Sequence, residues 1–535
     1  MIIPLTGMGG VAPKITPELL PPNLAQTALN VRLHNGGVQS LKTPITVATP
    51  TKAGSAVTIY RFGKNQPESQ YWFKWTTPVS VARGPIAGDT EETTYYSGDG
   101  LPKKTRFGLA TSSGTDYPVA YFNVKVPAPT GAPTLTPEAG TGPVVAETRA
   151  YVYTNVTAWG EESAPSPASL ADVTSTTVIR LSNFTAFPTG SYDFSSGSAC
   201  RRIYRSVSSS SGTNYYFVGE ILPGVTNWAD TTDIASVGEP LPSLDWDTPP
   251  DDLSGLIALP SGALCGFSKK EVCFSVIGAP YAWPQKYYLT CDYNIVAVAA
   301  MGQGVIVLTD GYPYFINSSD PESAQMIRLD EEQACVSARS VVAFGGGVVY
   351  ASPDGLVSIT QSGTTILTKD LYDNETWRAL TPANIFAVKH DNRYYGFLAS
   401  GGFILDTSGN FAFHDVTATS AYVDPVLDQL YVAVGTYIQK WDSGTAKNHV
   451  WKSKRHNLGK PVALTCAQIK ANAFTDLTFK MYVDGVLKYT KVVTSAEPFR
   501  LPSGFRSRIY EFEISGADHW TSAYVAGSME ELKGV

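Results

Sequence analysis

A hairpin-like pattern recurs through the middle of the chain and constrains the fold more than any other feature. Each copy is an apolar run, a tight turn containing Gly or Lys, and a second alternating run, as in a β-hairpin. The turn positions are Lys270, Gly311, Gly355, Gly402 and Gly435, and the last interval is the shortest. A spacing of roughly 40–50 residues, which the other intervals follow, is typical of β-propeller blades. The five copies span residues 263–276, 305–318, 348–361, 395–408 and 430–443.

A ring of such blades explains the pattern physically. A four-stranded blade has two apolar faces, and neighbouring blades bury them by stacking around an axis. Two further hairpins, at residues 56–77 and 93–107, would add blades from the N-terminal side. We expect strands from both ends of the chain to close the ring. A β-helix and a stack of sandwiches are the alternatives, although the period is too long for a β-helix coil.

The composition also favours strands. Charged residues make up only 16% of the 535 residues, and aromatic residues make up 11%. Aromatic and β-branched residues favour strands, whereas the frequent Gly and Pro mark turns. We therefore predict an all-β protein.

Changes in composition along the chain divide it into segments. A Pro/Gly/Thr-rich linker at residues 126–144 interrupts the hairpins. The segments after it, "RAYVYTNVTAWGEESAPSPAS" and "CRRIYRSVSSSSGTNYYFVGEI", resemble a fibronectin type III-like or related immunoglobulin-like sandwich. The expected domains are an N-terminal arm (1–50), the first propeller blades (51–125), the fibronectin III-like insert (126–245), the remaining blades (246–450) and a C-terminal jelly-roll-like β-sandwich (451–535).

The lead-in at residues 15–44 is rich in proline and is followed closely by the first blades. Its patch 23–31 is expected to form one or two helical turns, with Leu24, Ala28 and Val31 on one side. Two interpretations stay open for this arm. It packs on its own propeller, or it reaches a blade edge or a neighbouring subunit and helps to seal a ring.

The sequence offers little of the chemistry that most enzymes and metalloproteins need. HExxH, GxSxG and P-loop motifs are absent, and the six histidines show no zinc-ligand spacing. The six cysteines lie mostly in apolar runs and are interpreted as buried free thiols. The basic segment 451–460 is interpreted as a solvated linker. We expect no metal, no cofactor and no catalytic residue.

A propeller-type glycan-binding protein or glycosidase is the alternative function. The segments "SPDGLVSI" (352–359) and "LDTSGNFAFHD" (405–415) are similar to the Asp-box turns of sialidases. That alternative predicts a pocket at the propeller axis lined by arginines and carboxylates. The available arginines, which no spacing ties together, are Arg328, Arg339, Arg378 and Arg393.

Both ends of the chain resemble the tail nozzle proteins of short-tailed bacteriophages, of the tail tubular protein B and packaged-DNA stabilisation types. The N-terminal motif matches at Leu20, Pro21, Asn23, Ala25, Ala28, Asn30, Gly37, Leu41, Lys42 and Pro44. The C-terminal motif matches at Arg506, Arg508, Tyr510, Glu511, Ile514, Ser515, Gly516, Val525, Ser528, Glu531 and Leu532. The sandwich insert after the first blades is a departure from the family.

The resemblance implies a virion structural protein without enzymatic activity. Copies of the chain, six in the family, would form a ring below the portal and its adaptor ring, extend the DNA channel, retain packaged DNA and anchor fibres, a spike or a tail tip. The net charge of −7 suits a wall that DNA passes without binding. The chain shows no signal peptide and no membrane-spanning stretch, so synthesis in the bacterial cytoplasm is expected. The expected assembly interface comprises Leu20, Pro21, Asn23, Asn30, Arg32 and Leu41.

Overall fold

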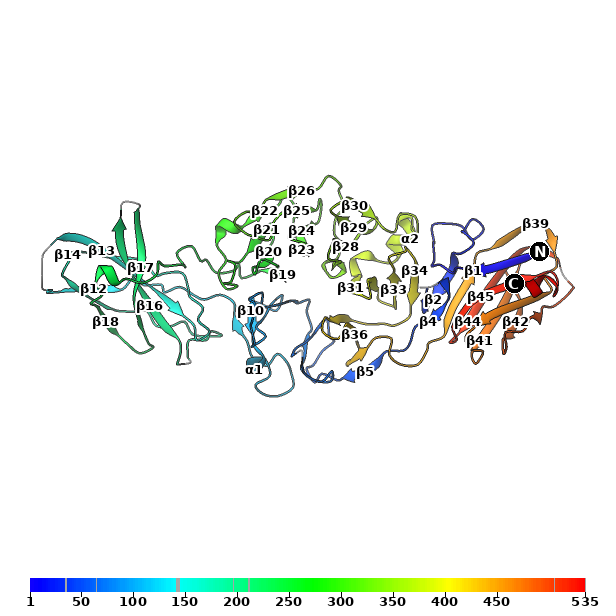
Figure 1. Ribbon diagram of the computed structural model, residues 1–535, viewed down its shortest axis with the longest axis horizontal. Coiled ribbons are helices and arrows are strands. Elements are labelled where there is room, and N and C mark those ends of the chain that lie inside the picture. The colour runs from blue at the N-terminus through cyan, green and yellow to red at the C-terminus, as the bar shows by residue number, and fades with distance from the viewer. Residues whose placement is uncertain are drawn as a thin grey trace.

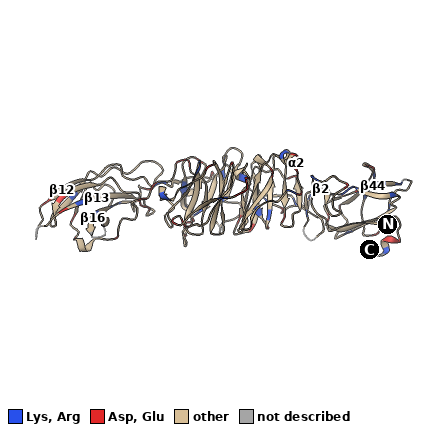
Figure 2. Cartoon of the chain, turned by 90° about the horizontal axis from the view of Figure 1, so that it is seen from above, with Lys and Arg blue, Asp and Glu red and all other residues tan. Residues whose placement is uncertain are grey.

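Three β-modules lie in a row in the computed structural model (Figure 1). The structure describes residues 1–33, 36–63, 65–140, 145–195, 197–209, 212–504 and 506–534. The insert occupies one end, the propeller the middle, and a C-terminal sandwich the other end, where both termini lie. Figure 2 shows the same order after a 90° turn, with the positions of basic residues in blue and of acidic residues in red along the chain.

Seven small sheets surround one axis and form the propeller. Their inner strands contact one another in the ring order β8, β19, β23, β27, β31 and β35, then β6. Buried side chains of Tyr60 and Phe73 pack with Val79 and Val81 and join β6 to β8. The blades are β6 (Thr58–Arg61) and β7 (Trp72–Trp75); β8 (Ser80–Arg83), β9 (Thr94–Ser97), β10 (Lys103–Thr105) and β11 (Phe122–Asn123); β19 (Ser254–Ala258), β20 (Leu264–Ser268), β21 (Glu271–Phe274) and β22 (Leu289–Thr290); β23 (Ile295–Met301), β24 (Gly304–Thr309), β25 (Tyr314–Ile316) and β26 (Met326–Arg328); β27 (Val342–Ala343), β28 (Gly347–Ser352), β29 (Gly355–Thr360) and β30 (Gly363–Ile366); β31 (Phe386–His390), β32 (Arg393–Phe397), β33 (Gly402–Leu405) and β34 (Phe411–His414); and β35 (Ser420–Asp424), β36 (Gln429–Val434), β37 (Tyr437–Lys440) and β5 (Ile45–Ala48).

All seven hairpins predicted for the propeller are present. They are the antiparallel pairs β6–β7, β9–β10, β20–β21, β24–β25, β28–β29, β32–β33 and β36–β37. The longest interval, between Gly355 and Gly402, contains the helix α2 (Asn374–Ala379). The shortest interval, from Gly402 to Gly435, contains strands and their turns without a helix.

Strands from both ends of the chain close the ring, as expected. The strand β5 pairs antiparallel with β37, with Ala48 opposite Ile438 and Ile45 opposite Lys440. The last blade thus takes its outer strand from the N-terminal region. This pairing holds the first and last parts of the propeller together, as in other closed rings of blades.

The insert is a two-sheet antiparallel sandwich, as the sequence predicted. Tyr151 and Tyr153 share one face of β13 and are buried in its core. One sheet has the order β12 (Thr134–Glu138), β15 (Val178–Ser182), β18 (Asn227–Asp230); the other has the order β14 (Ser169–Thr174), β13 (Ala146–Val156), β16 (Cys200–Ser209), β17 (Gly212–Ile221).

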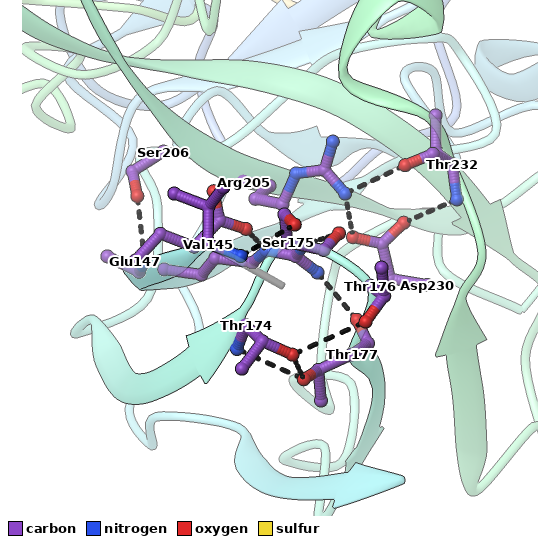
Figure 3. A network of polar contacts seen from close by, with 12 residues as sticks. Val145, Glu147, Thr174, Ser175, Thr176, Thr177, Arg205, Ser206, Asp230 and Thr232 are labelled. Atoms are coloured by element: carbon purple, nitrogen blue, oxygen red, sulfur yellow. Dashed lines mark hydrogen bonds and ion pairs between the residues drawn. The ribbon is translucent and has the colours of Figure 1, made fainter. Parts of the chain in front are cut away.

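A buried ion pair joins the two sheets of the insert (Figure 3). Arg205 Nη1 lies 2.6 Å from Asp230 Oδ2 and 3.0 Å from the carbonyl oxygen of Thr232. The hydroxyl of Tyr151 donates to the same carboxylate at 2.7 Å, and the backbone N–H of Thr232 donates to Oδ1 at 3.0 Å. The buried carboxylate of Asp230 is therefore fully hydrogen-bonded, which a charge out of contact with water requires.

The C-terminal sandwich includes strands from the N-terminal region. One of its sheets has the order β1 (Ile2–Thr6), β45 (Trp520–Ala526), β40 (Cys466–Ala471), β43 (Phe499–Arg500). The other is the outer half of a ten-stranded sheet and contains β38 (His449–Ser453), β44 (Ser507–Gly516), β41 (Leu477–Val483) and β42 (Val486–Val492), with β39 (His456–Val462) also on β44. The N-terminal segment is therefore part of two modules.

Two local predictions are wrong. The patch 23–31 is not helical but contains the strands β2 (Ala25–Leu29) and β3 (Val31–Arg32), the latter paired with β4 (Gln39–Ser40). The basic segment 451–460 is not a solvated linker, because it lies in β38 and β39. In both places the tertiary pairing decides the local structure, against a weak local preference.

The remaining regular elements are short. They are α1 (Phe107–Ala110) and the 3-10 turns η2 (Ile234–Ser236), η3 (Gln285–Tyr287), η4 (Ala338–Ser340), η5 (Pro382–Asn384) and η6 (Glu531–Gly534). None of the helices in the described part of the chain has the length and apolar character needed to cross a membrane. All six cysteines are buried free thiols, as predicted.

Candidate functional site at the junction of the arm with the C-terminal sandwich

The strand β2 joins the propeller to the C-terminal sandwich. It runs parallel to β34, with Leu29 opposite Phe413, and antiparallel to β38, with Ala28 opposite Trp451. This insertion turns two separate sheets into the single ten-stranded sheet. We call β2 and its neighbours β34 and β38 the junction.

Gly10 lets the arm approach the propeller closely beside the start of β2. A Cβ atom on Gly10 would lie 2.3 Å from the carbonyl oxygen of Phe411, which no side chain could tolerate. The adjacent N–H of Val11 donates to that oxygen at 2.8 Å, and Ala25 N–H donates to the Gly10 carbonyl at 2.9 Å. The arm is thus hydrogen-bonded to the outer edge of a blade.

The six residues predicted to form an assembly interface have different surroundings. Leu20, Asn30 and Leu41 are buried inside the subunit, and Arg32 is half-buried. Pro21 and Asn23 are exposed. Their role between subunits stays a prediction. Only the exposed residues Pro21 and Asn23 can contact a neighbouring subunit without a rearrangement of this one.

Asn30 fixes the end of β2. Its backbone has a φ of +56°, a left-handed conformation that Asn tolerates better than most residues. Its Nδ2 donates to Asp415 Oδ2 at 3.1 Å and to the Asn448 carbonyl at 3.2 Å, and its Oδ1 accepts from Asp415 N–H at 3.2 Å. One side chain therefore contacts the ends of both neighbouring strands.

A cluster of charges holds the arm against β38 and β44. The buried carboxylate of Glu511 accepts from Lys452 and Arg455, each at 2.5 Å, and Arg455 also pairs with Glu18 of the arm at 2.7 Å. Burial raises the pKa of Glu511, but the two cations outweigh this effect and leave its pKa below the usual value. Lys452 and Arg455 of the basic segment are thus paired with carboxylates within the subunit, which does not favour a phosphate site there.

A buried serine–histidine pair lies beside the junction. Ser40 Oγ is 2.8 Å from His449 Nδ1, and Trp520 Nε1 donates to His449 Nε2 at 3.1 Å. Because Nε2 accepts, the neutral ring carries its proton on Nδ1 and donates to Ser40, which in turn donates to the Ala517 carbonyl at 2.9 Å. This tautomer cannot take a proton from Ser40, so the pair is a structural relay and not a nucleophile with its base.

Two neutral histidines flank β2. Burial lowers the pKa of His449, in β38, to about 4, and that of His414, in β34, to about 3. The ring of His414 packs against Phe397 and Trp441, and neither of its nitrogens has a hydrogen-bond partner among the described residues. An imidazolium at either position would be a buried charge without a hydrogen-bonded carboxylate.

The propeller axis encloses a cavity of about 680 Å³. Its described lining is mostly small side chains, such as alanine, serine and valine, with Arg339 as its one cation and without a carboxylate. Arg339 donates to the carbonyls of Val57 and Thr419, at 3.0 and 2.8 Å, and its guanidinium lies 4.5 Å from the ring centroid of Phe386. Arg339 therefore braces blades across the axis.

The four arginines considered for a sialidase-like site do not gather. Arg328, at the end of β26, lies over the ring of Tyr312. Arg378 lies in α2, and Arg393, at the start of β32, pairs with Asp391 in the turn before it. The axial lining therefore differs from what the glycosidase alternative predicts.

The two Asp-box-like segments are turns. Ser352 Oγ donates to the Gly355 carbonyl at 3.1 Å, and Asp354 N–H donates to Ser352 Oγ at 3.2 Å. Asp406 Oδ1 accepts from the N–H groups of Ser408 and Asn410, at 2.9 and 2.8 Å. The described residues also contain no group of three or more His, Cys, Asp or Glu side chains arranged to hold a metal ion.

Comparisons with known proteins leave the family open. No family model matches the chain, and no curated protein matches it. Among solved structures, a gluconolactonase of Xanthomonas campestris is 8% identical, covers 45% of this chain and 81% of its own, and has a TM-score of 0.22. The β-propeller domain of Myceliophteria thermophila Cps50 (Swd1) is 9% identical, covers 47% of this chain and 92% of its own, and has a TM-score of 0.23. PorZ, a surface component of the type-IX secretion system of Porphyromonas gingivalis, is 11% identical, covers 80% of this chain and 77% of its own, and has a TM-score of 0.25. With TM-scores this low, the propeller assignment depends on the strand pairing described above.

Sequence reasoning missed the relay and the charge cluster of the junction. Ser40 and His449 are 409 positions apart, and Glu18 and Arg455 are 437 apart. No local motif contains both members of either pair. The one available signal was that both ends of the chain carry residues that match the same family.

Proposed function

We propose that this chain is a structural subunit of the tail nozzle of a short-tailed bacteriophage. The observation that carries the proposal is the meeting of the two matched motifs, which lie at opposite ends of the sequence. Val38, between the motif residues Gly37 and Leu41, and Trp520, between the motif residues Gly516 and Val525, exchange backbone hydrogen bonds of 2.9 and 3.2 Å. Motifs recognised independently at the two ends thus form one structural unit.

Two cations that belong to neither motif, Lys454 and Arg455, link the two motif regions. Glu511, in the C-terminal motif, holds Arg455, which holds Glu18 beside the N-terminal motif. Lys454 donates to the carbonyl oxygen of Leu20, a residue of the N-terminal motif. These contacts favour the interpretation that both motifs preserve the same junction.

In this proposal, copies of the chain, six in the family, form a ring below the portal and its adaptor ring in the virion tail. The ring extends the DNA channel and retains the packaged genome, and its acidic surface lets DNA pass without binding. The insert lies on the other side of the propeller from the junction (Figure 1), which leaves it free to anchor fibres, a spike or a tail tip.

The test is the assembly state of the purified full chain, alone and with its adaptor protein, by mass photometry and electron microscopy. We expect closed six-fold rings, and the same polypeptide in the tail of virions by mass spectrometry. Absence of the polypeptide from virions would exclude the proposal.

A double variant tests the exposed part of the predicted interface. Pro21→Glu with Asn23→Lys should prevent ring closure and leave the melting temperature unchanged, because both residues are exposed. The matched control is Lys488→Glu, an exposed change on β42. Rings that form equally well in the double variant would move the interface elsewhere.

A further inference from the structure

A cleft of about 330 Å³ lies where the insert meets the propeller. The loop between β8 and β9, the end of β10, the 159–161 turn of the insert and the 278–281 turn line it. Gly88, Gly160 and Gly278 stand on its rim, and a Cβ atom on any of them would meet nothing within 4 Å. Ligand sites are often found at such domain boundaries, with volumes of roughly 300–1,000 Å³.

Arg106 presents an unused hydrogen-bonding edge to this cleft. Its Nε donates to Thr93 Oγ1 at 3.2 Å, and its guanidinium lies 3.9 Å from the ring centroid of Trp159. These two contacts fix the plane of the guanidinium. Within the described chain, its two terminal nitrogens donate to no protein acceptor, although guanidinium groups bind carboxylates with paired N–H groups.

The two carboxylates that line the cleft are already engaged. Asp89 accepts from the N–H groups of Glu91 and Thr93, at 3.0 and 2.7 Å. Glu161 is paired with the buried ammonium of Lys104 and accepts from Thr157 Oγ1 at 3.2 Å. Both carboxylates thus have hydrogen-bond donors other than Arg106, and Glu161 also has its own cation, so no ion pair between them and Arg106 occupies the guanidinium.

A second polar group lines the cleft without a partner. Tyr95 is only 3% exposed, and its hydroxyl makes no hydrogen bond to the described residues. Because Tyr95 lines the cleft, its hydroxyl is available there as a donor or acceptor to a ligand. The aromatic side chains of Trp159, from the insert, and Tyr281, from the propeller, also line the cleft.

We propose that this cleft binds a small organic carboxylate of about the size of one sugar acid. The carboxylate pairs with the terminal nitrogens of Arg106, and the Tyr95 hydroxyl donates to an oxygen of the same ligand. A charge-assisted, forked contact of this kind gives both orientation and strength. The ligand would contact both the propeller and the insert. This binding site does not depend on the proposed role of the chain in a phage tail.

Isothermal titration calorimetry of the full chain with glucuronate tests the proposal, with glucose as the neutral sugar of similar shape. We expect saturable binding of glucuronate and binding of glucose that is at least about tenfold weaker, because glucose lacks the charge that Arg106 pairs with. Arg106→Gln should weaken glucuronate binding by at least about tenfold, and Tyr95→Phe by a few-fold.

Two further variants separate binding from folding. Ile86→Trp, at a half-exposed position on the cleft, should block binding without removing any contact of Arg106. Arg328→Gln, which removes an arginine stacked on Tyr312 away from the cleft, should leave affinity unchanged. No saturable binding of glucuronate, equal binding of glucose, or unchanged affinity in both Arg106→Gln and Ile86→Trp would overturn the proposal.

Discussion

At the scale of single residues, buried ionisable groups set how the protein responds to pH. His414 and His449 are neutral in the folded chain because burial lowers their pKa to about 3 and about 4. In an unfolded chain, the pKa of histidine is about 6.5. As the pH falls, the unfolded state therefore binds protons first, and the folded state loses relative stability.

The expected result is a free energy of unfolding that falls below about pH 6.5, by up to about 1.4 kcal/mol per pH unit for each such histidine. The loss continues until the folded pKa values of about 3 and about 4 are reached. His414→Phe should make the unfolding free energy fall less steeply with falling pH, because one titrating histidine is removed. The substitution should be tolerated, since a phenyl ring can pack against Phe397 and Trp441 as the imidazole does. Urea unfolding of both proteins between pH 5 and 7 measures the difference, and identical slopes would contradict the prediction.

The buried pair Lys104–Glu161 gives a second test at this scale. Glu161→Gln leaves the ammonium of Lys104 buried without its counter-charge, which is expected to cost about 3–5 kcal/mol of unfolding free energy. Adding Lys104→Met should recover most of that loss, because an apolar side chain needs no partner. Chemical denaturation of the two variants measures both effects.

The exposed pair Lys125–Asp251 is the matched control. Asp251→Asn should change the unfolding free energy by less than about 1 kcal/mol, since the carboxylate faces solvent. Equal losses in Asp251→Asn and Glu161→Gln would mean that burial does not set the energetics of these pairs.

At the scale of elements, β2 decides whether propeller and C-terminal sandwich unfold together. Ala28 is buried between β34 and β38, so Ala28→Asp places an uncompensated carboxylate in the ten-stranded sheet. We expect a loss of several kcal/mol and two separate calorimetric transitions in place of one. The adjacent Thr27 is exposed, and Thr27→Asp should leave a single transition near the wild-type temperature.

The same element shows the limit of sequence reasoning. The hairpins of the propeller were predictable because each consists of local alternation around a turn. The strand β2 was not, because Leu24, Ala28 and Val31 follow a helical spacing, while the partners that make this segment a strand lie in the last third of the chain. The basic segment was misread for the same reason, since Glu511 and Glu18 compensate its charges from distant parts of the chain.

Of the candidate site, the sequence located the segments but not their contacts. Matching motifs pointed to both ends of the chain, and three of the predicted interface residues, Leu20, Asn30 and Leu41, are buried within the subunit. That these residues are buried within one subunit depends on a register between distant strands. Such a register is set by tertiary packing and leaves no local pattern.

At the scale of the whole molecule, the insert is expected to be removable. Lys125 and Asp251, on either side of it, lie 2.9 Å apart between Nζ and Oδ1, so a short linker spans the gap. Because Glu161 lies in the deleted segment, the deletion is combined with Lys104→Met, which removes the cation that would lose its partner. In that background, replacing residues 127–249 by a Gly-Ser linker should leave the propeller and C-terminal sandwich folded, with a melting temperature lowered by less than about 8 °C. Differential scanning calorimetry tests this, and loss of the cooperative transition would show that the propeller needs the insert.

The pairing of N-terminal strands with C-terminal ones has a consequence for synthesis on the ribosome. The strand β5 emerges early, but its partner β37 follows only after most of the chain has been made, since Ala48 lies opposite Ile438. At about 5–20 residues per second, β5 waits roughly 20–80 seconds before its partner exists. During that time the arm must stay soluble as an unpaired chain. Its frequent prolines resist pairing with strands of other nascent chains, so the same residues that shape the junction also protect the protein while it is incomplete.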